Sequence, residues 1–110
     1  MTYGDLHEST LDERLAEQLE KAESKVREAR LLLESATRKA DKAKAENETL
    51  KARIGRIDAP APFLVNEMSA ASARADTAIT EQQKLEKELQ TAEGHRDELQ
   101  LARDQLDGVC

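Results

Sequence analysis

The chain has 110 residues and a formal net charge of −6, with 38% hydrophobic residues but only 2% aromatic ones. Because compact globules of this length use aromatic side chains for much of their buried area, this composition argues against an ordinary globular core. The negative charge argues against general nucleic-acid binding, which needs a basic surface, and no apolar stretch approaches the roughly 20 residues of a membrane span.

Residues 1–9 are predicted to form a short N-terminal tail. They show no basic start followed by an apolar run, so no secretory signal is predicted. Two pairs with the spacing of a capping box, Asp5 with Glu8 and Thr10 with Glu13, offer starts for the helix that follows.

The first helix is predicted over residues 10–57. From Leu15 onward, apolar residues recur at alternating steps of three and four, which keeps one stripe of a helix facing a partner helix. Its many alanines and leucines are typical of long coiled-coil helices. The stripe consists of Leu15, Leu19, Ala22, Val26, Ala29, Leu33, Ala36, Ala40, Ala43, Asn47, Leu50, Ile54 and Ile57.

Residues 58–62 are predicted to form a turn that breaks the helix. Pro60 and Pro62 both lack a backbone N–H, and each pushes the preceding residue away from the α region. Gly55 weakens the helical turn before them. Pro62 also suits the first turn of a second helix, where its missing donor has no cost.

The second helix is predicted over residues 63–107, with Gly108 as a stop signal and residues 108–110 as a tail. Its stripe has the same spacing as the first but is interrupted by Gln82, Arg96 and Arg103. The stripe consists of Leu64, Met68, Ala71, Ala75, Ala78, Gln82, Leu85, Leu89, Ala92, Arg96, Leu99, Arg103, Leu106 and Cys110.

Two stripes of nearly equal length predict an all-α fold, a long two-helix antiparallel coiled-coil hairpin. Folding about Ala59 sets Leu33 against Leu85, with small residues facing each other in the middle. The alternative is a broken or kinked rod whose stripes pair with helices of other chains. Asn47 at a core position before Leu50 is typical of parallel dimers and favours that alternative.

The larger members of both stripes are the candidate interaction residues. Alanine layers bury little area, so we expect helices of partner proteins, or further copies of the chain, to complete the packing. The seam residues are Leu15, Leu19, Val26, Leu33, Asn47, Leu50, Ile54, Leu64, Met68, Leu85, Leu89, Leu99 and Leu106. A second contact edge is predicted at Leu31, Leu32, Val65 and Ile79.

Basic residues gather before the predicted turn. The stretch from Arg38 to Arg56 contains seven basic and three acidic residues. A patch here would suit an acidic partner surface. A solvated helix face with charges paired at i,i+4 is the favoured interpretation, because Asp41, Glu46 and Glu48 interrupt the run. The patch would consist of Arg38, Lys39, Lys42, Lys44, Lys51, Arg53 and Arg56.

No motif for catalysis, for a cofactor or for a metal is found. His7 and His95 are far apart, and neither has a second His or Cys three or four residues away. The carboxylates are predicted to line exposed helix faces and not a concave pocket. Cys110 is the single cysteine, so no intramolecular disulfide forms and a reducing, cytoplasmic compartment is predicted.

The residues thus predict a non-enzymatic structural or adaptor subunit that packs with helices of partner proteins, with no membrane contact. The two stripes and the interruption Ile57-Asp58-Ala59-Pro60-Ala61-Pro62 resemble the small coiled-coil subunits of cytoskeletal assemblies, including ciliary axonemes. This resemblance implies a microtubule-associated scaffold at the cytoskeleton or cilium.

Two other functions stay open at this point. One is a secreted helical-hairpin factor similar to the WXG-type proteins, although Arg53-Ile54-Gly55 stands where those proteins carry Trp-x-Gly. The other is a nucleic-acid-binding helical arm, in which the stretch from Arg38 to Arg56 tracks phosphates with salt-sensitive affinity.

Overall fold

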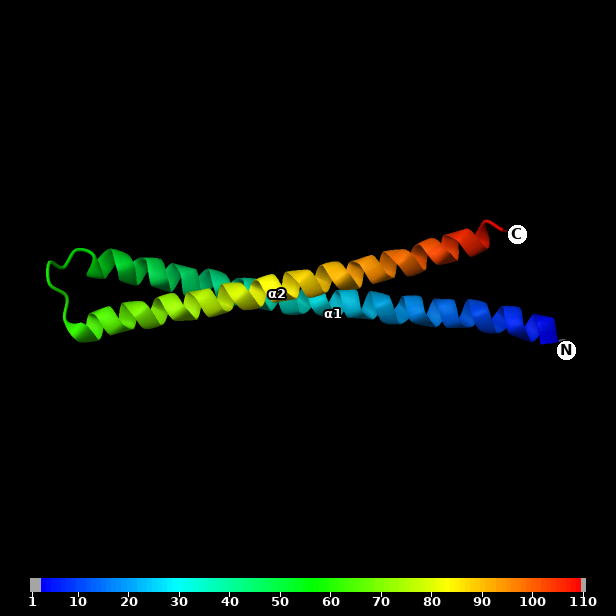
Figure 1. Ribbon diagram of the computed structural model, residues 1–110, viewed down its shortest axis with the longest axis horizontal. Coiled ribbons are helices and arrows are strands. Elements are labelled where there is room, and N and C mark those ends of the chain that lie inside the picture. Colours follow the sequence, from blue (N-terminus) through cyan, green and yellow to red (C-terminus); the bar gives the residue numbers. More distant parts are fainter. Residues whose placement is uncertain (1–2, 110) are drawn as a thin grey trace. The chain divides into compact units, whose positions relative to one another are not determined.

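The computed structural model describes the backbone of residues 3–109 and the side chains of residues 11–109. Almost all of this range belongs to two α-helices, α1 (Tyr3–Ile54) and α2 (Pro62–Asp107) (Figure 1). No strand occurs between residues 3 and 109. The predicted all-α fold is confirmed.

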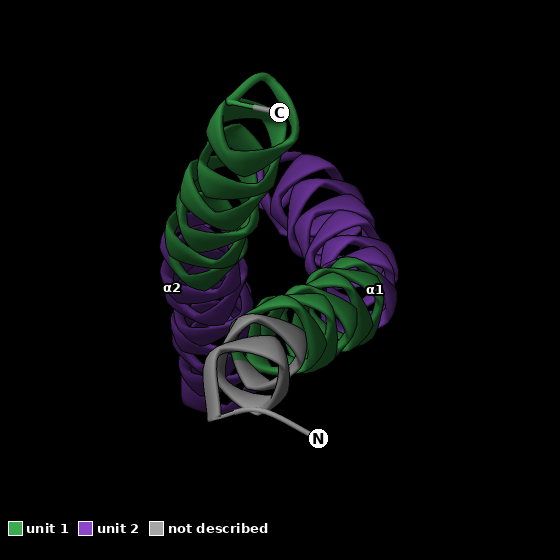
Figure 2. Cartoon of the chain, turned by 90° about the vertical axis from the view of Figure 1, so that its right-hand side faces the viewer, with its two compact units in different colours: residues 1–30, 88–110 green, residues 31–87 purple. Residues whose placement is uncertain are grey.

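The helices form two compact units, which Figure 2 shows in separate colours. Unit 1 comprises Met1–Arg30 with Glu88–Cys110, and unit 2 comprises Leu31–Lys87, which includes the turn. In each unit a segment of α1 lies beside a segment of α2.

The two segments run antiparallel within each unit. In unit 1, residues 12–16 lie beside residues 103–107, whereas residues 23–30 lie beside residues 96–100. In unit 2, the side chain of Gln82, in α2 after the turn, reaches Thr37, in α1 before the turn. The structure therefore has the helical hairpin of the first prediction and not the rod.

One stripe of α1 is covered by α2. Between residues 11 and 54, every buried or half-buried residue except Thr37 belongs to the predicted stripe. Leu19, Val26 and Ala40 have exposed fractions of 3%, 2% and 0%. The repeat of 3.5 residues explains this pattern, because it returns each stripe residue to the same side of the helix.

The seam of unit 2 is narrow in its middle. Ala36 and Ala40 of α1, and Ala71 and Ala75 of α2, are all buried. Side chains this small let two helices approach toward the short end of the usual separation of about 8–10 Å. Larger residues, such as Ile54 with an exposed fraction of 5%, occupy the seam near the turn.

The start of α1 differs from the prediction. The helix begins at Tyr3, so most of the predicted tail over residues 1–9 is helical. Residues 5–11 contain no proline and no glycine, so no residue among them prevents the helix from starting before Thr10. The side chains of both predicted capping pairs, except Glu13, lie outside the described residues, as do those of His7 and Cys110.

The end of α1 also differs from the prediction, since the helix stops at Ile54 and not at Ile57. The N–H of Gly55 still donates to the carbonyl of Lys51 at 2.8 Å, and the chain then leaves the helix. Ile57, the last predicted stripe residue of α1, is 43% exposed. The turn therefore spans residues 55–61 and not residues 58–62.

Pro62 is the first residue of α2, one position before the predicted start. The carbonyl of Ala61 accepts hydrogen bonds from the N–H groups of Leu64 at 2.9 Å and Val65 at 3.2 Å, which caps this end of the helix. Proline is favoured at this position because its missing N–H would have had no helical partner. The other end of α2 falls at Asp107, as predicted.

Candidate helix-packing site

The seam residues lie where α1 and α2 meet within each unit, and all but one of them are buried or half-buried. Leu19, Val26 and Ile54 are buried, and Leu106 is exposed at 38%. The half-buried ones are Leu15, Leu33, Asn47, Leu50, Leu64, Met68, Leu85, Leu89 and Leu99. Within each unit, the chain's own helices therefore cover most of both stripes.

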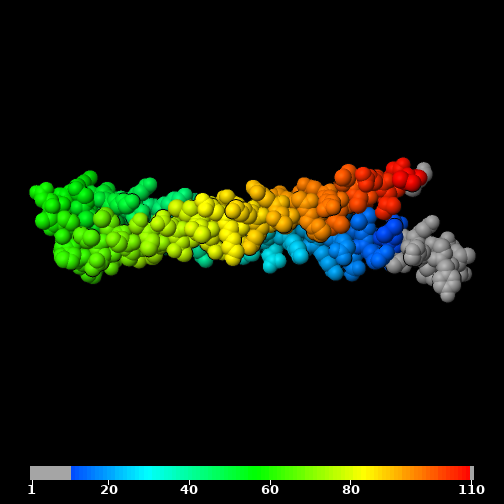
Figure 3. All heavy atoms as spheres, in the orientation of Figure 1, coloured from blue at the N-terminus to red at the C-terminus, as the bar shows by residue number. Residues whose placement is uncertain are grey.

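In unit 1 the two helix segments touch along their side chains. Figure 3 shows the α2 segment of this unit, in orange, directly against the α1 segment, in blue. The contact is less complete than in the middle of unit 2. Ala22 and Val26 of α1 are buried, whereas Ala92 and Leu99 of α2 are half-buried, and Arg103 is exposed.

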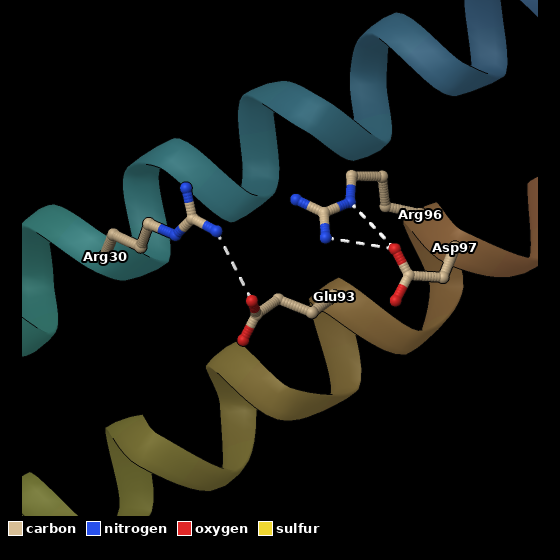
Figure 4. Close-up of polar contacts among 4 residues, drawn as sticks. All are labelled: Arg30, Glu93, Arg96 and Asp97. Carbon is tan, nitrogen blue, oxygen red and sulfur yellow. Dashed lines mark hydrogen bonds and ion pairs between the residues drawn. The ribbon is translucent and has the colours of Figure 1, made fainter. Parts of the chain in front are cut away.

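Charged side chains flank the seam of unit 1 (Figure 4). Nη2 of Arg30 in α1 lies 3.3 Å from Oε2 of Glu93 in α2, and the two side chains are 56% and 34% exposed. An ion pair this exposed adds at most about 1 kcal/mol, because solvent screens it. It serves better to favour one register of the two helices than to stabilise them.

Arg96 occupies a stripe position of α2 and is half-buried. Its Nε and Nη2 donate to Oδ1 of the neighbouring Asp97 at 3.1 and 3.0 Å (Figure 4). The guanidinium thus finds an acidic partner on its own helix. This explains how a charged residue is accommodated in the stripe.

Two amides lie in the seam of unit 2 and differ in their hydrogen bonding. Nε2 of Gln82 donates to Oγ1 of Thr37 across the seam at 3.1 Å. Oδ1 of Asn47 is buried, and no described residue donates a hydrogen bond to it. A buried polar atom without a partner destabilises the folded chain.

The predicted basic patch does not form a single face. All seven residues are exposed, and Arg56 lies beyond the end of α1. Arg38 makes an i,i+4 ion pair with Glu34 at 4.0 Å. The remaining positions are distributed around the helix by their spacing, which supports the interpretation of a solvated surface.

The predicted second edge is not brought together either. Leu31, Leu32 and Val65 are 67%, 51% and 39% exposed, and Ile79 is half-buried. Leu32 borders a hollow, which has a volume of about 360 Å³ and lies between α1 and α2 of unit 2. Its lining residues are Leu32, Ser35, Ala36, Lys39, Thr77, Ala78, Glu81 and Leu85.

A second apolar hollow, in unit 1, was not predicted from the sequence. It has a volume of about 380 Å³ and is lined by Leu11, Leu15, Ala102, Gln105, Leu106 and Val109. Leu11 lies one position off the predicted stripe, so the stripe gave no signal for this hollow.

The described residues show neither a metal site nor a membrane-spanning segment. Within residues 11–109, no group of three or more His, Cys, Asp or Glu side chains could hold a metal ion. Neither helix, over its described length, has a segment apolar enough to cross a bilayer. No protein-family model matches this sequence, and no curated protein or solved structure matches it either.

Proposed function

We propose that this chain is a non-enzymatic structural or adaptor subunit, whose helical hairpin packs against helices of partner proteins in a larger assembly. The exposed area of the chain carries this proposal. The chain exposes 8549 Å² at a mass of 12.2 kDa. Folded monomers of this mass expose only about 6,100 Å² according to the usual scaling of area with mass.

The excess is roughly 2,400 Å² for one chain, more than the about 800 Å² that each partner buries in an interface of standard size. Apolar side chains contribute to it. Val109, Phe63 and Leu31 are 82%, 70% and 67% exposed. Two apolar hollows flank the seam, so part of this surface is shaped to receive side chains of another helix.

The core supports the same conclusion. Among the buried residues of the described chain, only Leu19, Val26 and Ile54 are larger than alanine. A fully buried side chain of this size contributes about 1.5–3 kcal/mol, and alanine much less. Since ordering each residue costs about 1–2 kcal/mol, so few large residues leave the isolated hairpin marginally stable. A partner helix would supply the missing burial.

Within this proposal, a microtubule-based filament such as the ciliary axoneme is the first setting to test. It rests on the resemblance of the two stripes and their proline interruption to small coiled-coil subunits of such assemblies.

The test combines a stability measurement with a capture experiment. Circular dichroism of the purified full chain, from about 1 to about 100 µM, is expected to show a melting temperature that rises with concentration. Tagged chain, captured from its own cells under native conditions, is expected to retain coiled-coil proteins. A high melting temperature that is independent of concentration, together with capture of no helical protein, would refute the proposal.

A further inference from the structure

We infer that a polar hollow in unit 1 binds a phosphate group, with the guanidinium groups of Arg27 and Arg30 in α1 and of Arg96 in α2 as its donors. The inference goes beyond the proposed function, because it concerns an anionic ligand and not the packing of apolar helix faces.

The hollow lies between α1 and α2 and has a volume of about 350 Å³. Arg27 and Arg30 are three residues apart and are therefore neighbours on the surface of α1, whereas Arg96 comes from α2. Guanidinium groups from two helices thus border one space, and every lining residue belongs to unit 1. The lining residues are Glu23, Val26, Arg27, Arg30, Arg96, Asp97 and Gln100.

Two of these guanidinium groups, those of Arg30 and Arg96, point toward each other across the space between the helices (Figure 4). Like charges in this arrangement repel. Each is paired with one carboxylate, that of Glu93 at 3.3 Å and that of Asp97 at 3.0 Å. No ion pair joins Arg27 to any residue whose side chain the structure describes. An anion in the hollow would therefore reduce the repulsion and give Arg27 a partner.

Several N–H groups remain for such a ligand. Arg30 donates to its carboxylate through Nη2, and Arg96 donates through Nε and Nη2, which leaves Nη1 of both. Arg27 adds the five N–H groups of a complete guanidinium. One guanidinium satisfies the two oxygens of a carboxylate, whereas a phosphate group has three or more acceptor oxygens and carries close to two negative charges. Donors from three arginines therefore suit phosphate better than a carboxylate.

The surroundings limit the affinity. Unit 1 has fourteen acidic and seven basic residues, a formal net charge of −7, so its long-range field repels anions. Arg27 and Arg30 are also exposed, and contacts between exposed charges contribute little each. We therefore expect a dissociation constant of roughly 1–10 mM for inorganic phosphate.

A titration of the isotope-labelled full chain with sodium phosphate, followed by carbon-detected NMR of the arginine guanidinium groups, tests the site. Sodium chloride keeps the ionic strength constant, so that general screening does not change. The signals of Arg27, Arg30 and Arg96 are expected to follow one saturable curve, with half of the change at roughly 1–10 mM. Signals that do not saturate, or an equal change at Arg14, which lies in unit 1 outside the hollow, would overturn the inference.

Three matched variants locate the site, and circular dichroism checks that each keeps its helicity. Arg27→Gln is expected to weaken phosphate binding at least about threefold, whereas Arg14→Gln changes it less than about 1.5-fold. Glu23→Gln is expected to strengthen binding, because Glu23 lies one turn before Arg27 and competes with the ligand for its guanidinium. An unchanged affinity in Arg27→Gln, or weaker binding in Glu23→Gln, would refute the site.

Two further probes identify the ligand class and its source. Acetate is expected to bind at least about threefold more weakly than phosphate, since it has fewer acceptor oxygens and a single charge, and equal binding of acetate would overturn the assignment to phosphate. The tripeptide Ala–phosphoserine–Ala with blocked ends identifies the source. Tighter binding of this peptide than of inorganic phosphate would assign the site to a phosphorylated side chain, and binding that is no tighter would assign it to free phosphate. A chain that binds none of these anions overturns the inference and leaves the proposed adaptor function standing.

Discussion

Replacing Asn47 by leucine is expected to make the hairpin more stable. Oδ1 of Asn47 is buried in the seam and receives no hydrogen bond from any described residue. Such an unsatisfied group costs roughly 1–3 kcal/mol. Because Asn47 is only half-buried, we take the lower part of that range and expect a gain of about 1–2 kcal/mol, which raises Tm by roughly 5–10 °C.

Urea and thermal unfolding, followed by circular dichroism at one fixed concentration, measure this change. Asn66→Leu is the matched control, because Asn66 is an exposed residue of α2 and the same replacement there should change stability by less than about 0.5 kcal/mol. If Asn47→Leu lowers the midpoint, or shifts it no more than Asn66→Leu does, then Oδ1 has a partner in solution and the reasoning is wrong. A pair of Asn47 side chains from two parallel chains would be that partner.

Three further changes test the seam. Leu19→Ala should lower the free energy of unfolding by about 2 kcal/mol or more, since Leu19 is 3% exposed, whereas Leu101→Ala, at a residue 57% exposed, should change urea midpoints little. Gly94→Ala should raise Tm and stabilise by about 0.5–1 kcal/mol, because nothing lies within 4 Å of the new methyl group; a decrease would contradict this. Arg30→Gln, which removes the ion pair with Glu93, should cost less than about 1 kcal/mol in low salt and less still in high salt.

The spacing of the stripes predicted which side of each helix is covered. It succeeded best in α1, where Thr37 is the only buried or half-buried residue outside the stripe. Thr37 is also the residue that accepts the hydrogen bond of Gln82, so its burial follows from a contact with the other helix. A pattern along one helix cannot reveal such a contact, because it depends on the side chain opposite.

Helix ends were predicted less well, for a local reason. The prolines were correctly identified as the break, but α1 already ends at Ile54, before Gly55. Glycine has a low helix propensity, so a chain that meets two prolines a few residues later gains little by continuing the helix through Gly55. At the other end of α1, the two capping pairs suggested starts at Asp5 and Thr10, whereas the helix already begins at Tyr3.

The two apolar hollows escaped prediction because they arise from pairs of helices. Leu11 lies one position away from the stripe, and Val109 follows the end of α2, so neither belongs to a helical pattern. They become neighbours only when α1 and α2 of unit 1 run antiparallel. Leu32 was recognised as an apolar residue beside the stripe, yet its place in the hollow depends on Ala78 and Leu85 of the opposite helix.

Alanine in the seam and leucine at its edge have opposite consequences for this chain. Ala40 and Ala75 bring the two helices close but contribute little burial, so they define the pairing more than they stabilise it. Leucines at those positions would have made a more self-sufficient hairpin. The larger apolar side chains of Leu11 and Leu32, beside the seam, are 44% and 51% exposed, and Leu106 in the seam is 38% exposed. Small residues thus define how the two helices pair, whereas several larger apolar side chains stay exposed, and this contrast is the reason why we propose that a partner helix completes the packing.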